Sequence, residues 1–460
     1  MDRGFCFDVP ILKSSIEPVD QSLQELNKRV IHHEKENGVS SHFFFACIFL
    51  ASLAPIVSAR PDTVSNPVGS YYTGVYRNLF ADLLGVPDSI VDAHIDSTFQ
   101  QLFYGKDSTE RVYFPVEPDM AYIEDVNNKD VRTEGMSYGM MICVQLNKKP
   151  EFDRLWKWAK VHMQFQSGSH RGYFGWHCRT NGIVLDSTAA SDGEEWFVTS
   201  LLFASARWGN REGMYNYRKE AQIILNTMLH KESETDHGTV TNMFDQKQKL
   251  VTFVPNTTAS RFTDPSYQLP HFYELWARWA DSDNHFWCDV AFASRKFLHR
   301  AVDSVTGLSP DYAGFDGRPI GSWFGGHDDF RFDAWRVAMN VAVDNEWFAQ
   351  DPWEVVETNR LLDFFHNQGI NSYGNQYSLK GKEFGADHSA GLVAMNAVAC
   401  LASTSEYRKE FVKALWDHPV PSGPYRYYDG MLYMLGLIQV SGNFRIYQLT
   451  PSPVPACTSD

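Results

Sequence analysis

Apolar residues recur along this chain with the period of an α-helix, whereas runs with the alternation of a β-strand are few and short. One such run is VTFVP, at 251–255. The helical pattern predicts twelve helices, over residues 87–103, 133–147, 150–166, 192–209, 213–230, 266–281, 284–302, 332–348, 353–368, 388–402, 405–417 and 428–440. We therefore expect an all-α fold.

The predicted helices follow one another in pairs. Short connections, such as 147–150 and 281–284, join the two members of a pair, and longer loops separate the pairs. In several pairs the first helix carries little charge, whereas the second is amphipathic. Buried helices that alternate with half-exposed ones predict two concentric rings. The alternatives are an irregular all-α protein and a pair of helical domains, but no linker after residue 75 divides the chain.

The segment RTEGMSYGMMICVQLN, at 132–147, has almost no charge after its first residues, so we expect a helix that is buried on all sides. Glu134 lies at the start of this helix, and Tyr138 follows one turn later on the same face. Gly135 and Gly139 remove side chains from one side, which would let another backbone approach closely. A glutamate in a first helical turn also suits the helix dipole, so Glu134 alone does not establish a site.

Three further helices begin with or follow an aspartate: Asp192, Asp264 and Asp333. The last of these helices also carries a polar stripe at helical spacing, made of Asp333, Arg336, Asn340 and Asp344. Charges on a buried helix are costly unless they are paired or functional. Each aspartate by itself could be an N-cap. Four acidic helix starts in one ring, below loops rich in aromatic residues, favour a shared polar cleft.

The composition narrows the substrates that such a cleft could take. Of the 460 residues, 43% are hydrophobic and 14% aromatic, including 13 Trp, which suits stacking against flat ligands or sugar faces. The net charge of −15 argues against nucleic acid and anionic membranes as partners. The seven cysteines show no paired metal spacing and no disulfide framework, and the chain contains neither HExxH nor a Gly-rich phosphate loop. We expect a neutral substrate, no metal and no cofactor.

Paired carboxylates in an aromatic cleft are typical of glycosidic bond cleavage, in which one carboxyl must be protonated and the other ionised. The position of Glu134 at a helix start works against a proton, because the helix dipole stabilises the ionised form. Burial and a neighbouring anion must therefore raise the pKa of Glu134 if it is to act as an acid. Asp192 is a candidate for that neighbour.

Four separated motifs resemble glycoside hydrolase family 8, in the right order and within residues 65–450: TEGMSYGMM, SDGEEWF, DPSYQLPHFYELWA and FDAWRVAMN. The resemblance implies an (α/α)6 barrel, a six-hairpin toroid, which agrees with the twelve predicted helices, and an inverting mechanism. It implies Glu134 as general acid, Asp333 as general base, and Asp192 as the residue that helps to hold the sugar ring in a distorted shape. Tyr267 would contact the attacking water. We also assign Arg336, Tyr138 and Asp264 to substrate binding.

Within this family the chain is most similar to xylan-active enzymes, and especially to reducing-end xylose-releasing exo-oligoxylanases. The segment GADHSAGLVAMNAVA carries this likeness and implies that His388 closes the cleft beyond the leaving sugar. The expected substrate is a xylo-oligosaccharide. An endo-acting β-1,4-xylanase or other β-1,4-glycanase is the alternative enzyme. A non-catalytic sugar-binding protein is an alternative of another class, although both Glu134 and Asp333 are present. Neither the basic clusters of uronic lyases nor the acidic arrays of terpenoid cyclases stand out.

The N-terminal region predicts secretion. A polar leader at 1–41 precedes an apolar segment at 42–59, which resembles a signal peptide in length and ends with the small-residue sequence Val57-Ser58-Ala59. An uncleaved signal anchor is the alternative, because the leader is long and partly acidic. The sequon at Asn256 is compatible with an extracellular route. We expect an N-terminal arm at 60–75, one catalytic barrel at 76–450, a tail at 451–460, and a monomer.

Overall fold

Helices account for most of the secondary structure in the computed structural model, which describes residues 68–233, 238–322, 325–449 and 457. In this described part, twelve helices of ten or more residues follow one another, after two short ones, α1 (Ser70–Thr73) and α2 (Leu79–Leu84). The twelve are α3 (Asp88–Tyr104), α4 (Thr133–Gln145), α5 (Lys149–Trp158), α6 (Ser191–Trp208), α7 (Tyr217–His230), α8 (Pro270–Trp279), α9 (Asn284–Ala301), α10 (Arg336–Trp347), α11 (Trp353–Gln368), α12 (Ala390–Ala399), α13 (Arg408–Asp417) and α14 (Arg426–Val440).

Each of the twelve predicted helices is confirmed. The largest difference is at the end of the helix predicted at 150–166, because α5 ends at Trp158 and a π-helical turn, η2 (Ala159–Met163), follows it. Among the other helices, the largest differences concern three that begin later than predicted. Before α7, α8 and α10 the chain forms a separate 3-10 turn: η3 (Gly213–Tyr215), η5 (Pro265–Tyr267) and η6 (Phe332–Trp335). Side chains fix two of these boundaries. Asn216 accepts the Lys219 amide at the start of α7, and Asp264 accepts the Ser266 amide at 2.7 Å before η5.

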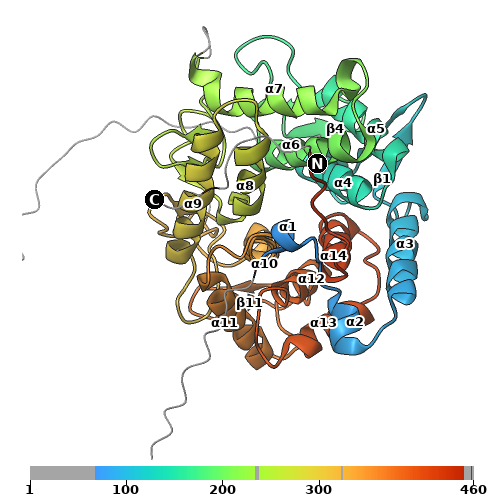
Figure 1. Cartoon of the computed structure of the whole chain (residues 1–460), viewed down its shortest axis with the longest axis vertical. Helices are drawn as coiled ribbons and strands as arrows, with labels where there is room; N and C mark the ends of the chain where they lie inside the picture. The colour runs from blue at the N-terminus through green and yellow to red at the C-terminus, as the bar shows by residue number, and fades with distance from the viewer. Residues whose placement is uncertain (1–67, 234–237, 323–324, 450–456, 458–460) are drawn as a thin grey trace, which may run out of the picture. The chain divides into compact units, whose positions relative to one another are not determined.

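Helices with little charge alternate with amphipathic ones, as predicted. Every residue of α12 is buried, as is nearly every residue of α4, whereas α11 and α13 each expose one face. The buried helices pack on amphipathic neighbours, in the pairs α4–α5, α6–α7, α8–α9, α10–α11, α12–α13 and α14–α3. In Figure 1, α10, α12 and α14 lie near the centre of the view, and α3, α7, α9 and α11 lie at its edge.

The buried helices also contact one another in sequence. Direct packing joins α4 to α6, α8 to α10, α10 to α12, α12 to α14, and α14 back to α4. The link from α6 to α8 runs through side chains: the Trp276 indole donates to Thr199 Oγ1 at 3.0 Å, and Trp196 meets Phe272 edge to face. Gly436 allows the close approach of α14 to α12, because a Cβ there would lie 2.9 Å from the Ala394 Cβ. The series of contacts returns to its first helix.

The two glycines of α4 make room for side chains. A Cβ on Gly135 would lie 2.5 Å from the Tyr427 ring, and one on Gly139 would lie 2.9 Å from Ile123. The prediction that another backbone would approach α4 at these positions is therefore wrong. Glycine spacing shows that something lies close to a helix, but not whether it is backbone or a side chain.

In the part of the chain that the structure describes, the strands form five small antiparallel sheets within the loops. They are β1 (Tyr113–Val116), β2 (Met120–Ile123), β3 (Asp130–Arg132), β4 (His177–Arg179), β5 (Val184–Asp186), β6 (Phe244–Asp245), β7 (Leu250–Val251), β8 (Phe262–Thr263), β9 (Ala313–Gly314), β10 (Gln376–Tyr377) and β11 (Glu383–Gly385). Of the predicted strand at 251–255, only Val251 pairs in a sheet. The three-stranded sheet β3–β4–β5 leads directly into α4 and so positions Glu134.

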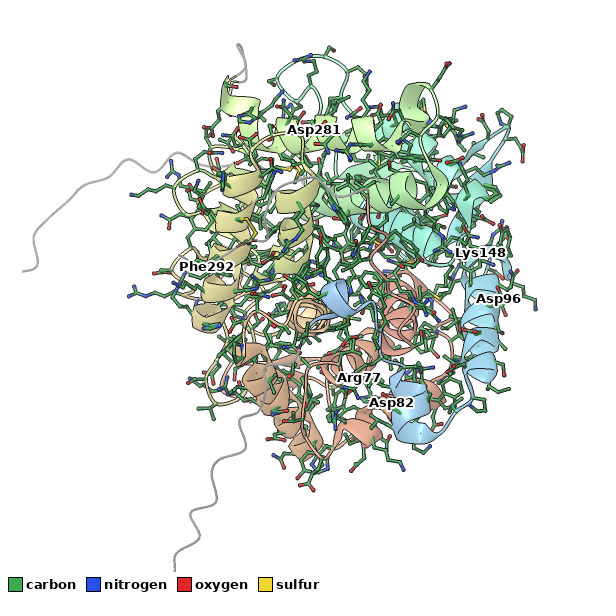
Figure 2. All side chains as sticks on the ribbon, in the orientation of Figure 1. Arg77, Asp82, Asp96, Lys148, Asp281 and Phe292 are labelled. Carbon is green, nitrogen blue, oxygen red and sulfur yellow. A yellow bond between two sulfur atoms is a disulfide. The ribbon has the colours of Figure 1, made fainter. Side chains whose placement is uncertain are left out.

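A disulfide joins Cys288 on α9 to Cys457 in the C-terminal tail, with Cα atoms 5.4 Å apart. The sequence analysis did not predict it, because partners 169 positions apart leave no spacing signal. The surface carries ion pairs such as Arg77–Asp82 and Lys148–Asp96 (Figure 2).

Among the described residues, no helix has both the length and the apolar character needed to cross a membrane. The predictions for the leader at 1–41 and for the signal-like segment at 42–59 lie outside the described residues. Most of the arm at 60–75 and of the tail at 451–460 lies outside them as well.

Candidate active site

Glu134, Asp192 and Asp333 line a single cavity of about 530 Å³. Glu134 and Asp192 lie in the first turns of α4 and α6, and Asp333 lies in the 3-10 turn η6 that leads into α10. The two helix starts touch closely, because a Cβ on Gly193 would lie 2.5 Å from the Thr133 side chain. The three predicted catalytic carboxylates therefore meet at one end of the helical unit.

The Arg336 guanidinium contacts all three carboxylates from the interior side of the cavity wall. The Arg336 side chain is 2% exposed, and its Nη1 lies 3.1 Å from Glu134 Oε2 and 3.0 Å from Asp192 Oδ2. Its Nη2 lies 3.2 Å from Asp333 Oδ1. One guanidinium thus faces three carboxylates in a buried place, so its charge cannot balance all of them. The cluster must hold at least one proton to limit the cost of buried negative charge.

Glu134 is the carboxyl that the geometry favours as the proton carrier. Burial raises the pKa of Glu134 to about 7, Arg336 opposes this, and the nearby charges of Asp333 and Asp192 add to the rise. The expected effect of the helix dipole is therefore overridden. A carboxyl with a pKa near 7 can donate a proton at neutral pH, as a general acid must.

Asp192 is the most deeply buried of the three carboxylates. Its side chain is 6% exposed, and its Oδ1 accepts the Gly193 amide at 2.9 Å. Burial raises the pKa of Asp192, and Arg336 opposes the rise. Asp192 lines the cavity, and its carboxylate is held by the Gly193 amide and the Arg336 guanidinium. A carboxylate fixed in this way is suited to holding a substrate.

Asp333 is the most accessible of the three, with 31% of its side chain exposed. Its Oδ1 accepts a hydrogen bond from the Tyr428 hydroxyl at 3.2 Å. The residue before it, Phe332, has a φ of 31°, in a region that residues other than glycine rarely adopt. Strain of this kind persists only where the surroundings fix it, and it is common at active sites.

Two further carboxylates lie behind the base. Oxygen atoms of Asp264, Asp311 and Asp333 all lie within 4.8 Å of one another. Asp264 is fully buried, and Asp311 lies 2.5 Å from His327 Nδ1. Burial and the charge of the neighbouring carboxylates raise the pKa of Asp264 and the pKa of Asp311 well above the usual range of an aspartate. Three carboxylates at this spacing could also hold a hard cation, but burial of this kind favours protons.

Three of the residues assigned to substrate binding lie beneath the cavity wall. Arg336 and Tyr138 are 2% and 1% exposed, and the Tyr138 hydroxyl lies 2.6 Å from Arg336 Nη1. Asp264 is fully buried. They support Glu134, Asp192 and Asp333 from behind, because the polar stripe of α10 faces the inside of the helix cluster. Tyr267 does line the cavity, as predicted.

His388 lies just before α12 and does not line this cavity. Its Nδ1 lies 2.9 Å from the Tyr373 carbonyl oxygen, so it must carry the hydrogen, and Nε2 is left as an acceptor in the neutral ring. The same segment is tied to the base. The Trp335 indole donates to the Asn375 carbonyl at 3.0 Å, and the Asn375 amide donates to Ser389 Oγ at 2.8 Å.

The sequence analysis missed two tyrosines that line the cavity. The Tyr427 hydroxyl donates to Glu134 Oε1 at 2.9 Å, and Tyr428 contacts Asp333 as described. A signal was present, because both residues lie at the start of the charge-poor helix α14. The predicted helix began at 428, which placed Tyr427 outside it.

The cavity wall also contains groups typical of sugar binding. Trp176 lines it, with the Arg132 guanidinium 5.8 Å from the Trp176 ring centre, together with the amide side chains of Asn127 and Asn128. Arg132 is held by Asp125 and Asp130 at 3.1 and 3.0 Å. An aromatic face beside amide groups matches a ligand that has both apolar ring faces and hydroxyls.

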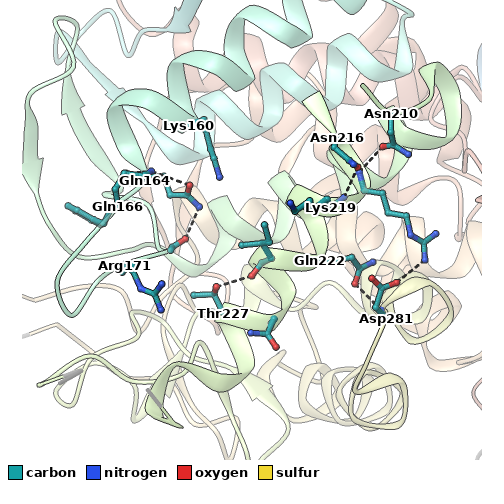
Figure 3. Close-up of a pocket in the computed structure, with 15 residues that line it drawn as sticks. Lys160, Gln164, Gln166, Arg171, Asn210, Asn216, Lys219, Gln222, Thr227 and Asp281 are labelled. Carbon is teal, nitrogen blue, oxygen red and sulfur yellow. Dashed lines mark hydrogen bonds and ion pairs between the residues drawn. The ribbon is translucent and has the colours of Figure 1, made fainter. Parts of the chain in front are cut away.

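A larger hollow of about 660 Å³ lies elsewhere, between α7 and the loop after α5 (Figure 3). Most of its walls are amides and cations, including Lys160, Arg218 and Lys219. Among the described residues that line it, the one acidic group is Asp281, which is paired with Arg218 at 3.0 Å. This hollow lacks the second carboxyl that acid–base hydrolysis requires. The smaller cavity at Glu134 is therefore the candidate active site, despite its size.

Comparisons with known proteins agree with this geometry. Residues 121–442 match the family described as glycosyl hydrolases family 8. The chain is 44% identical to the reducing-end xylose-releasing exo-oligoxylanase Rex8A of Paenibacillus barcinonensis, over 82% of this chain and 98% of the relative. It is 40% identical to the reducing end xylose-releasing exo-oligoxylanase of Halalkalibacterium halodurans, over 82% of this chain and 96% of the relative.

Solved structures show the same likeness. A complex of a Rex8A variant with alpha-L-arabinofuranosyl-xylotetraose has a TM-score of 0.80 at 43% identity, covering 83% of this chain and 99% of the other. A xylobiose complex of a family 8 protein from Teredinibacter turnerae has a TM-score of 0.79 at 42% identity, covering 84% of this chain and 100% of the other. The carboxylate cluster and the helical fold agree with these matches, and the chain belongs to glycoside hydrolase family 8.

Proposed function

We propose that this enzyme hydrolyses β-1,4-xylo-oligosaccharides and releases xylose from the reducing end, with inversion at the anomeric carbon. The observation that carries the proposal is the single Arg336 guanidinium that joins Glu134, Asp192 and Asp333 in one cavity. The relatives named above, which carry this activity in their names, share 40–44% of their sequence with the chain.

The reaction needs one proton donor and one proton acceptor. Asp333 takes a proton from a water molecule as the water oxygen bonds to the anomeric carbon. Glu134 gives its proton to the glycosidic oxygen as the bond from that oxygen to the anomeric carbon breaks. Glu134 then regains a proton, and Asp333 loses one, through solvent. An inverting site places the two carboxyl groups about 6.5–9.5 Å apart, and we expect that separation here.

Asp192 and Tyr267 complete the machinery. Asp192, held by Arg336 and the Gly193 amide, would hold a sugar hydroxyl and stabilise the distorted ring without transferring a proton. Tyr267 is 5% exposed and lines the same cavity, so its hydroxyl could hold the attacking water. No cofactor takes part in this scheme.

The fold that carries the site is, we propose, an (α/α)6 barrel. The contacts α4–α6–α8–α10–α12–α14–α4 make an inner ring, and α3, α5, α7, α9, α11 and α13 make the outer one. Inner helices that all begin at the same end bring their first turns together. This explains why carboxylates far apart in the sequence share one cavity.

His388 is the residue that would select the reducing end. His388 does not line the cavity itself, but its segment is tied through Asn375 to Trp335, beside the base. We propose that this segment closes the cleft just beyond the leaving sugar, so that each event frees one xylose. The Nε2 of His388 could accept a hydrogen bond from the anomeric hydroxyl, because Nδ1 donates to the Tyr373 carbonyl oxygen. A site built around a substrate hydroxyl strongly rejects a ligand that lacks it.

An endo-acting xylanase is the second candidate. This candidate is kept because a catalytic mutant of a family 8 protein described as a xylanase, from Teredinibacter turnerae and solved with xylohexaose, is 42% identical to the chain. The test is the hydrolysis of a series of xylo-oligosaccharides, from xylotriose up to xylohexaose, each labelled at its reducing end. Labelled xylose as the first product supports the exo activity. Labelled xylobiose and xylotriose, or rapid shortening of long xylan, would establish the endo activity instead.

We further propose that the enzyme is secreted and acts as a monomer. The Cys288–Cys457 disulfide supports an oxidising compartment, where such bonds form and persist. Expression of the full chain with its own leader tests this, with N-terminal sequencing of protein from the medium. A mature chain that begins near Arg60 supports cleavage after Ala59, whereas membrane-bound protein that keeps the leader supports a signal anchor.

A further inference from the structure

The start of α14 contacts both halves of the catalytic pair. Two consecutive residues divide the work: the Tyr427 hydroxyl donates to Glu134 Oε1 at 2.9 Å, and the Tyr428 hydroxyl lies 3.2 Å from Asp333 Oδ1. Tyr428 also lies within hydrogen-bond distance of the Phe332 carbonyl oxygen, at 3.0 Å. Neighbouring residues on a helix point in different directions, so one helix start can reach two opposing groups.

Each tyrosine ring occupies a place prepared for it. Tyr427 is 4% exposed, and its ring takes up the space that a side chain on Gly135 would fill, directly after the acid. Tyr428 packs against Trp335, two residues after the base, with ring centres 5.7 Å apart. Both hydroxyls are therefore directed by packing and not only by their hydrogen bonds.

The helix start itself is fixed to the rest of the protein. Arg426, which is 4% exposed, donates to three backbone carbonyls: to Arg111 at 2.9 Å, to Asp107 at 2.7 Å and to Gly423 at 2.6 Å. On the other side, Asp429 Oδ1 accepts the Gly391 amide at 2.8 Å, which ties α14 to the start of α12. A rigid support of this kind is what a precisely held catalytic group requires.

We propose that Tyr427 and Tyr428 are positioning residues that hold the carboxyl groups of the acid and the base in the correct orientation relative to each other. This inference rests on the proposed function, because it assigns work to the same acid and base. Tyr427 fixes Oε1 of Glu134 while Arg336 holds Oε2, which orients the carboxyl. Tyr428 holds Oδ1 of Asp333 against the strained Phe332 backbone and leaves Oδ2 for the attacking water.

The two tyrosines should differ in what their loss does. A hydroxyl that donates to a carboxyl favours the ionised form, so removing the Tyr427 hydroxyl raises the pKa of Glu134 above about 7. The basic limb of kcat/KM then moves to higher pH, and kcat falls because the acid is less well oriented. Removing the Tyr428 hydroxyl frees Asp333 and Phe332 to move, so kcat falls while KM changes little.

The experiment compares Tyr427→Phe and Tyr428→Phe with a matched control, Tyr433→Phe. Tyr433 lies on the same helix, but its hydroxyl donates to the His418 carbonyl oxygen at 2.9 Å, away from the cavity. We expect each cavity variant to lose on the order of tenfold in kcat, the effect of one hydrogen bond to a charged group. We expect the basic limb to move only in Tyr427→Phe, and the control to keep wild-type kinetics. Melting temperatures of all three show whether folding accounts for any loss.

A measurement without substrate separates this inference from the proposed function. The Glu134 carboxyl can be titrated by ¹³C NMR in the wild-type protein and in Tyr427→Phe. A pKa of Glu134 that is unchanged in the variant, or equal kinetic losses in all three variants, would overturn the inference. If the titration shifts as expected but the wild-type protein hydrolyses no xylo-oligosaccharide, the positioning stands and the proposed function fails.

Discussion

Helix α10 carries a buried charge cluster at each end, and the two clusters differ in their balance. At its start, Arg336 Nη1 is shared between Glu134 and Asp192, and its Nη2 reaches Asp333. At its far end, Asp344 receives two parallel hydrogen bonds from Arg295, at 2.6 and 2.8 Å. The first cluster has one cation for three carboxyl groups, whereas in the second two cations, Arg295 and Arg278, face Asp344 and Glu274.

The far cluster also has a better balance of charge among its other members. Glu274 lies 2.8 Å from Arg295 Nη1 and 2.6 Å from Arg278 Nη1, so two cations face the carboxyl groups of Asp344 and Glu274. Burial and the charge of Asp344 raise the pKa of Glu354 well above its usual range, so Glu354 keeps a proton beside Asp344. Arg295 lowers the pKa of Asp344 although burial opposes this. Each end leaves one polar atom buried without a hydrogen-bond partner among the described residues, Arg336 Nε at the near end and Glu354 Oε2 at the far end, so the two clusters differ in charge balance and not in this respect.

The comparison shows how burial serves two purposes on one helix. A balanced cluster with bidentate geometry stabilises helix packing, because breaking it leaves a buried charge unpaired. A cluster with too few cations must share protons, and a carboxyl whose pKa lies near 7 can give one to a substrate. The excess of anions, and not burial alone, marks the catalytic end.

The largest expected effect comes from removing either member of the acid–base pair. Glu134→Ala and Asp333→Ala should each lower turnover by at least about 10²–10⁴-fold, the usual contribution of general acid or base catalysis. Steady-state rates on xylotriose measure this, with the melting temperature as the folding control. If Asp333→Ala stayed near wild-type activity while Asp264→Ala did not, the base would have been assigned to the wrong aspartate.

The opposite result is expected at the far end of α10. Arg295→Met leaves Asp344 buried without its cation and leaves Glu274 with Arg278 alone, which should cost about 3–5 kcal/mol of unfolding free energy. Chemical denaturation measures the loss, and the kcat of the remaining folded enzyme should be close to wild type. A variant of full stability would show that the far cluster contributes nothing to the packing of α8, α9 and α10.

A matched pair of isosteric substitutions sharpens the contrast. Asp192→Asn should lower turnover strongly with a stability loss of about 1 kcal/mol, the usual net value of one hydrogen bond, because Asn can still accept the Gly193 amide. Asp344→Asn should lower stability by more and turnover by less, because Asn cannot accept both hydrogen bonds from Arg295. Rate and melting temperature measured on the same samples decide between the two roles. Equal behaviour of the two variants would contradict the division.

Much of this arrangement could be predicted from the sequence, for a physical reason. Charge-poor segments must be buried, so they identified the inner helices, and acidic residues at their first turns pointed to Glu134, Asp192 and Asp333. The stripe Asp333–Arg336–Asn340–Asp344 was also visible, but it was interpreted as one feature. Spacing along a helix shows which face a residue lies on, but not which residues of other helices contact it. The roles of Arg336 and Asp344 differ because of those contacts.

The same limit explains what sequence reasoning left out. Asp311 and His327 lie in a loop without periodicity, so nothing in the pattern placed them behind Asp333. Tyr427 and Tyr428 contact their carboxylates only because α14 closes the series of inner helices onto α4. The Cys288–Cys457 disulfide depends on where a tail returns to the surface of α9.

The smallest effect expected is a divergence between the pH dependence of activity and that of stability. Glu134, with a pKa raised to about 7, is protonated below that value, so kcat/KM should fall about tenfold per pH unit above it. The pKa of Asp344 is lowered, so its contribution to stability is present above the unfolded value of about 3.9 and is lost only as the pH falls through the folded value. Between about pH 6 and 9 the Arg295–Asp344 pair should therefore keep its charge while the acid loses its proton. Profiles of kcat/KM and of melting temperature over this range test the divergence. A melting temperature that fell in parallel with activity above pH 7 would mean that loss of folded enzyme, and not loss of the Glu134 proton, limits the reaction.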